Sequence, residues 1–78
     1  METKQAEHAL RGSDGEYTIF GVYGDGVSIV CAMLYASRYG QGHHERRIRT
    51  GSERFVSVEE ARQEYKRLRS AGHVVVNL

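Results

Sequence analysis

Apolar and polar residues alternate with a helical period over the last third of the chain. The apolar positions recur at spacings of three and four residues: Val58, Ala61, Tyr65, Leu68 and Ala71. Ser57 and Glu60 have the spacing of a capping box, in which each side chain bonds to the backbone amide of the other residue. Gly72 supplies a left-handed stop. The pattern predicts one long helix that begins at Ser57 and ends at Gly72.

Two β-rich runs before this helix predict a hairpin. Residues 17–23 and 27–36 are rich in β-branched and aromatic side chains, and Gly24-Asp25-Gly26 joins them. We expect this turn to need a positive φ. Both sides of the second run are apolar, which predicts a central strand.

Two further strands are expected on either side of the helix. Residues 45–50 contain few apolar side chains, so they predict an edge strand that its charges protect from pairing. A turn at residues 50–53 then leads to the helix. Residues 73–78 centre on three consecutive valines, which predicts a strand covered on both faces.

These elements predict an α+β domain. It is an antiparallel β-meander with one long helix packed on the sheet and a C-terminal strand, in the order β-β-β-α-β. Residues 16–78 are expected to form this single domain. Residues 1–15 are polar, with a weak helical tendency at residues 6–11 that Gly12-Ser13-Asp14-Gly15 ends, so we expect a flexible N-terminal arm.

Composition narrows the class of protein further. The chain has 78 residues, 27% of them charged, and a net charge of +1, so charge on the whole molecule draws it neither to nucleic acid nor to a membrane. Nine of the eleven basic residues are arginine, which favours two-pronged contacts with phosphate or carboxylate. The single Cys31, expected to be buried in a strand, suits a reducing compartment. We therefore expect a cytoplasmic protein with no membrane contact.

The chemistry-bearing residues lack catalytic or metal-binding spacing. Gly21, Gly24 and Gly26 lie between two strands rather than before a helix, so they predict a turn and not a phosphate loop. His43 and His44 are adjacent and have no partner at helical spacing. No serine lies in a nucleophile elbow, and the carboxylates fall in turns or on the polar helix face. We expect a protein that is not an enzyme and that uses no cofactor or metal.

One cluster favours binding. Within about seventeen residues the chain gathers basic groups next to tyrosines: Arg38, Tyr39, His43, His44, Arg46, Arg47, Arg49 and Arg54. Residues 37–44 are expected to form a loop rich in glycine and hydrogen-bond donors. Guanidinium and aromatic groups together suit phosphate contact with base stacking, and they suit an acidic protein surface equally well. The plain alternative is a solvated edge strand.

Residues 39–73 resemble the WGR domain, a small nucleic-acid-associated module with one long helix. Tyr39-Gly40-Gln41 stands where that family has Trp-Gly-Arg, and residues 54–61 resemble its strand-to-helix entry. In size and type the chain also resembles small phage-encoded inhibitors such as anti-CRISPR proteins.

These features support three functional hypotheses. The first is a non-catalytic inhibitor, anti-CRISPR-like, that occludes a protein partner in a nucleic-acid-processing machine. The second is direct DNA or RNA binding in the WGR manner. The third is a small structural subunit, such as a homodimer, whose last strand pairs with another chain.

Overall fold

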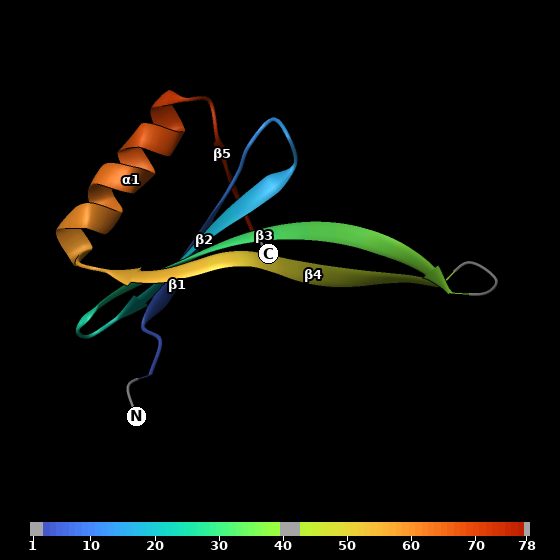
Figure 1. The fold of residues 1–78 in the computed structure, drawn as a ribbon, viewed down its shortest axis with the longest axis horizontal. Coiled ribbons are helices and arrows are strands. Elements are labelled where there is room, and N and C mark those ends of the chain that lie inside the picture. Colours follow the sequence, from blue (N-terminus) through green and yellow to red (C-terminus); the bar gives the residue numbers. More distant parts are fainter. Residues whose placement is uncertain (1–2, 40–42, 78) are drawn as a thin grey trace.

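In the computed structural model, one antiparallel sheet and one helix follow each other in the order β-β-β-β-α-β (Figure 1). The elements are β1 (Ala6–Arg11), β2 (Glu16–Tyr23), β3 (Gly26–Tyr39), β4 (His43–Val56), α1 (Val58–Ser70) and β5 (Val74–Val76). The structure describes residues 3–39 and 43–77, with side chains for 3–33 and 51–77. The expected α+β class, with one helix against an antiparallel sheet, is confirmed.

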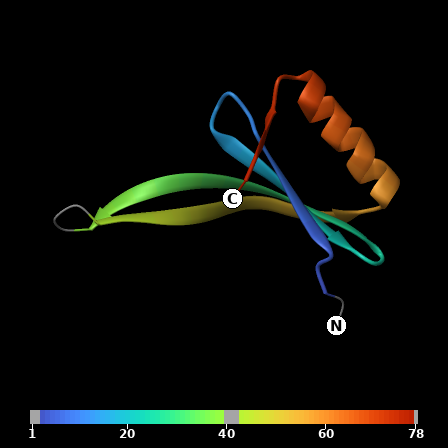
Figure 2. The ribbon, with the colours of Figure 1, turned by 180° about the vertical axis from the view of Figure 1, so that it is seen from behind.

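The strands lie in the order β4-β3-β2-β1-β5, so β4 and β5 form the two edges. The interior place of β3 and the edge place of β4 agree with the apolar and charged patterns of their sequences. Figure 2 shows the same sheet from behind, with the helix beside one end of it.

The prediction of three strands before the helix is wrong by one strand. The extra strand, β1, lies in the segment that was expected to be a flexible arm with a helical tendency. It pairs with β2 on one side and with β5 on the other, and its Leu10 is completely buried. Pairing with residues distant in sequence outweighs the weak local preference of a polar segment.

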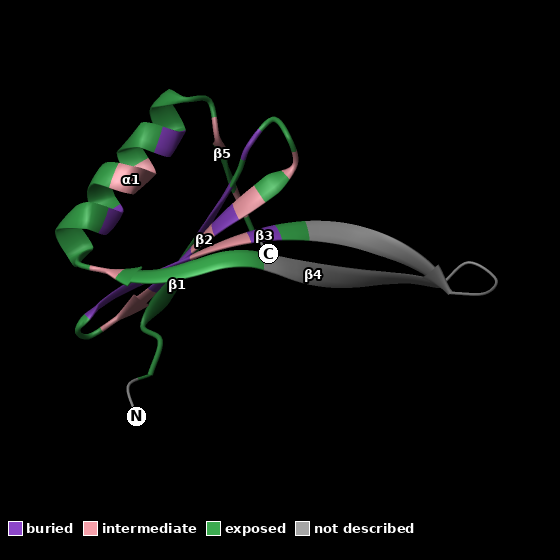
Figure 3. Ribbon diagram, in the orientation of Figure 1, coloured by how far each residue is buried: buried purple, intermediate pink, exposed green. Residues whose placement is uncertain are grey.

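The core lies between α1 and one face of the sheet (Figure 3). Its buried members come from four elements: Leu10, Phe20, Val27, Ile29, Ala61 and Leu68. Val22, Val56 and Tyr65 pack against them, and the Phe20 and Tyr65 rings meet edge to face at 5.6 Å.

The helix has the ends that its sequence predicts. Ser57 is the N-cap, and its hydroxyl accepts a hydrogen bond from the Glu60 amide at 3.2 Å. Gly72 follows the helix with a φ of 98°. The buried part of the predicted stripe is shorter than expected, because Val58 and Ala71 at its two ends are exposed.

The hairpin between β3 and β4 is longer than predicted. Each strand has 14 residues, so the described parts of the expected loop at 37–44 and the expected turn at 50–53 are strand. Residues 40–42 lie outside the described residues. A register shift between Val30 and Ala32 lets β4 continue through Gly51 without a turn.

Two details of the predicted strands are also corrected. Among the described residues, only Gly15 and Gly72 have a positive φ, so the turn at Gly24–Gly26 does not depend on one. β5 is an edge strand with Val74 and Val75 exposed by 48% and 57%, rather than a strand covered on both faces. Valine content alone does not distinguish these cases, because an edge strand also favours β-branched residues.

Candidate nucleic-acid interface

The two longest strands continue past the rest of the sheet. The last pair between β2 and β3 joins Glu16 to Met33, whereas β3 and β4 stay paired as far as Tyr39 and His43. We call residues 34–39 and 43–49 the basic ribbon. It projects from one end of the molecule (Figure 1), and six paired residues reach about 20 Å at the rise of a β-strand.

Most of the predicted binding residues lie on this ribbon. Arg38 pairs with His44, Tyr39 pairs with His43, and Arg46 and Arg47 pair with Ala36 and Tyr35. Arg49 lies at the base, opposite Met33. The pairing therefore gathers seven of the eight residues in one projecting element, as two paired strands and not as a loop.

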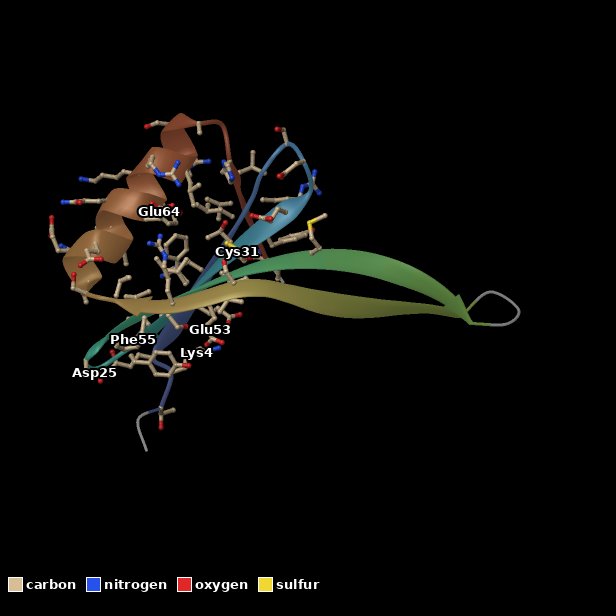
Figure 4. All side chains as sticks on the ribbon, in the orientation of Figure 1. Lys4, Asp25, Cys31, Glu53, Phe55 and Glu64 are labelled. Atoms are coloured by element: carbon tan, nitrogen blue, oxygen red, sulfur yellow. The ribbon has the colours of Figure 1, made fainter. Side chains whose placement is uncertain are left out.

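Arg54, the eighth predicted residue, lies outside the basic ribbon. It lies on the part of β4 that faces α1, where its Nη2 is 3.8 Å from Oε2 of Glu64. Arg67 Nε donates to the same oxygen at 3.1 Å, and Arg67 Nη2 donates to Oε1. Glu64, labelled in Figure 4, thus joins the helix to the sheet. The hydrogen bonds from Arg67 hold the pKa of Glu64 below its usual value, and the charge of Arg54 acts in the same direction.

Charge is divided between the ribbon and the rest of the chain. Residues 34–50 contain four arginines and one glutamate, which gives +3 with neutral histidines. The net charge of the whole chain is +1, so the other residues together carry −2. The near-neutral net charge of the whole chain is therefore the sum of a positive basic ribbon and a weakly negative remainder.

Basic register positions occupy both faces of the ribbon. Positions two apart along paired strands share a face, so Arg38 and Arg46 belong to one face. Arg47 and Arg49 belong to the other face, together with Tyr35. A partner that meets all four arginines must reach the ribbon from both sides.

Other surfaces offer less chemistry. A groove of about 390 Å³ lies beside α1, and its lining is mostly apolar, with His8 and Arg62 also contributing. No group of three His, Cys, Asp or Glu among the described residues could hold a metal ion. Cys31, expected to be buried, is partly exposed. In the described part of the chain, no helix has the length and apolar character to cross a bilayer.

Two features of this surface were not predicted from the sequence. The glycines around position 41 indicated a loop, although Tyr39 is a residue that strands favour and was a signal for a longer strand. The sheet face opposite α1 is the second such feature, because it includes β1, for which the sequence predicts no strand.

No family model matches this chain, and no curated protein or solved structure matches it significantly. The resemblances to the WGR domain and to anti-CRISPR proteins therefore stay predictions.

Proposed function

We propose that the protein is a non-catalytic nucleic-acid-binding protein that inserts its basic ribbon into the groove of a duplex. The observation that carries this proposal is the presence of arginine positions on both faces of a projecting two-stranded ribbon. The major groove of B-form DNA is about 12 Å wide, admits a two-stranded ribbon, and has phosphates along both walls. A groove therefore meets both faces of the ribbon at once.

This geometry favours nucleic acid over an acidic protein surface. A flat acidic patch contacts one face of the ribbon and leaves the arginines of the other face in water. Occlusion of a protein partner, the first of the hypotheses from the sequence, therefore ranks below direct binding. The proposed site of action is the cytoplasm, where a lone thiol such as Cys31 stays reduced.

The test is binding to a short DNA duplex over a salt series, with Arg46→Ala and Arg47→Ala as variants from opposite faces. Each phosphate contact that is lost should reduce the slope of log affinity against log salt by about 0.9. Arg62→Ala removes the same charge from an exposed position on α1 and is the matched control. Its slope should equal that of the parent.

The variants also separate the alternatives. If only one ribbon variant changes the slope, the ribbon lies flat on the duplex and the insertion geometry is wrong. If both variants bind as the parent does, the ribbon is a solvated edge. If the parent ignores duplex but a nuclease-resistant protein complex binds it in an Arg47-dependent way, the protein-occlusion hypothesis replaces this one.

A further inference from the structure

The face of the sheet opposite α1 carries a continuous apolar band. Val76, Ala9, Ile19 and Val30 are successive register partners, so they form one row across four strands. Further apolar members lie on either side of this row: Tyr17, Tyr23, Ala32, Phe55 and Val74. We call these residues the open sheet face. Figure 4 shows Phe55 on the side of the sheet away from the helix.

We propose that a second copy of this chain packs against the open sheet face, so that the protein is a dimer with two sheets inside and a helix on each outer side. Aligned face-to-face packing of two sheets is a common way to bury such a surface. The proposal is independent of the basic ribbon, because the apolar row lies on strands within the sheet.

The exposed area supports this arrangement. The chain exposes 5954 Å² of surface. A compact monomer of 8.8 kDa exposes about 4,800 Å², so the excess is roughly 1,200 Å². On the open sheet face, Phe55 and Val74 are exposed by 54% and 48%, whereas the small Ala9 and Ala32 are covered by their neighbours. A standard interface buries about 800 Å² per partner, which is less than the excess.

The charges of the open sheet face favour a copy of itself over nucleic acid. Lys4 and Arg11 supply two positive charges, and Glu7 and Glu53 supply two negative ones. Lys4 is already bound to Glu7, with Nζ at 2.6 Å from Oε2. A stacking platform for nucleic acid needs a positive surround, whereas a neutral apolar face is complementary to an identical neutral apolar face.

A two-fold axis along the apolar row makes the match specific. Such an axis stacks the row on itself and exchanges the positions on either side of it. Glu7 and Arg11 lie two residues before and two residues after Ala9 on β1. Each Glu7 therefore faces Arg11 of the second copy, which gives two equivalent ion pairs near the middle of the interface. Glu53 continues the row beyond Val30 and faces its own copy at the β4 edge of the sheet.

Sedimentation equilibrium of the full chain over a micromolar concentration series tests the proposal. The expected mass is twice 8.8 kDa. Val76→Glu places like charges near the axis and should weaken dimerisation about a hundredfold. Val75→Glu is the matched control, because Val75 is the adjacent, more exposed residue and pairs with Leu10 on the helix side. It should leave the dimer intact.

If Val76→Glu does not fold, an exchange of the charges at Glu7 and Arg11 tests the proposed dimer instead. Glu7→Arg and Arg11→Glu should each weaken the dimer, and the double variant should restore it to within a few fold of the parent. A parent that stays monomeric overturns the proposal, and so does a double variant as weak as the single ones. A monomeric parent whose Val76→Glu variant loses affinity for single-stranded DNA would assign the face to nucleic acid instead.

Discussion

At the scale of single residues, Gly26 lets β4 approach the start of β3. A Cβ at this position would lie 2.6 Å from the Val56 carbonyl oxygen and 2.7 Å from the Phe55 ring. The oxygen belongs to the backbone, so it cannot move aside without moving the strand.

We therefore expect Gly26→Ala to lower the free energy of unfolding by about 1–3 kcal/mol, as overpacking does. Urea denaturation measures this change. Gly51→Ala is the control, because its Cβ would be 3.4 Å from the Cys31 carbonyl oxygen, an ordinary contact distance, and its effect should stay within about 0.5 kcal/mol. Equal effects of the two variants would contradict the role given to Gly26.

Glu64 should make stability depend on pH. Its pKa in the folded protein is lowered, so its stabilising effect is present above the unfolded pKa and is lost as the pH falls through the folded pKa. Glu64→Gln should be less stable than the parent by about 0.5–1 kcal/mol at neutral pH. The difference in stability should shrink once the pH falls below the ordinary glutamate pKa, vanish below the lowered pKa of folded Glu64, and be smaller in high salt. Thermal melts across this range provide the measurement, and a difference independent of pH would contradict the assignment.

At the scale of elements, β1 is an integral part of the core. Leu10 is its fully buried residue, and Leu10→Ala should cost about 2–5 kcal/mol because it leaves a cavity in a small core. His8→Ala, an exposed position on the same strand, should change stability by less than about 0.5 kcal/mol. Urea midpoints compare the two variants. An unchanged midpoint for Leu10→Ala would support the flexible N-terminal arm predicted from the sequence.

The basic ribbon should open independently of the sheet. A two-stranded hairpin without a third strand is marginally stable in water, so its amides should exchange hydrogen faster than those between β2 and β3. Hydrogen exchange with mass spectrometry resolves these segments. Protection of residues 34–39 equal to that of residues 17–23 would show that the ribbon unfolds only with the whole domain. Bound duplex should slow exchange in the ribbon.

The elements that sequence predicts well are those whose signals are local. Ser57, Glu60 and Gly72 place both ends of α1 within a few residues, and the structure confirms both ends. β1 has no comparable signal, because its interior place in the sheet depends on pairing with β5, which lies at the other end of the chain. Exposure of β5 also depends on its place in the strand order, which no local pattern encodes.

The candidate site follows the same rule. The sequence identified the arginine cluster, because closeness along the chain implies closeness in space within one hairpin. It could not show that Arg54 leaves the cluster, since this depends on which face of β4 the residue occupies and on Glu64 in the following helix. Nor could it show that the cluster is a projecting ribbon, because this follows from where β2 begins.

At the scale of the whole molecule, the charge distribution is asymmetric, with the positive charge concentrated on the basic ribbon. A ribbon of +3 on a body of −2 should orient the molecule before it touches a polyanion, which raises association rates at low salt. In the proposed dimer, the two-fold axis crosses the strands, so the two ribbons point in opposite directions. Such a dimer binds two separate stretches of nucleic acid and does not clamp one stretch from both sides.

The pairing of β1 with β5 has a consequence for how the chain folds. Ala9 and Val76 are partners although they lie 67 residues apart, whereas β2, β3 and β4 join neighbours through hairpins. Closing a long loop costs more entropy than closing a hairpin, so the meander should form before the transition state and the β5 edge after it. Changes at Val76 should then accelerate unfolding and leave the folding rate almost unchanged, while changes at Ile29 should slow folding. The pairing of β5 with β1 should therefore be the last part of the sheet to form.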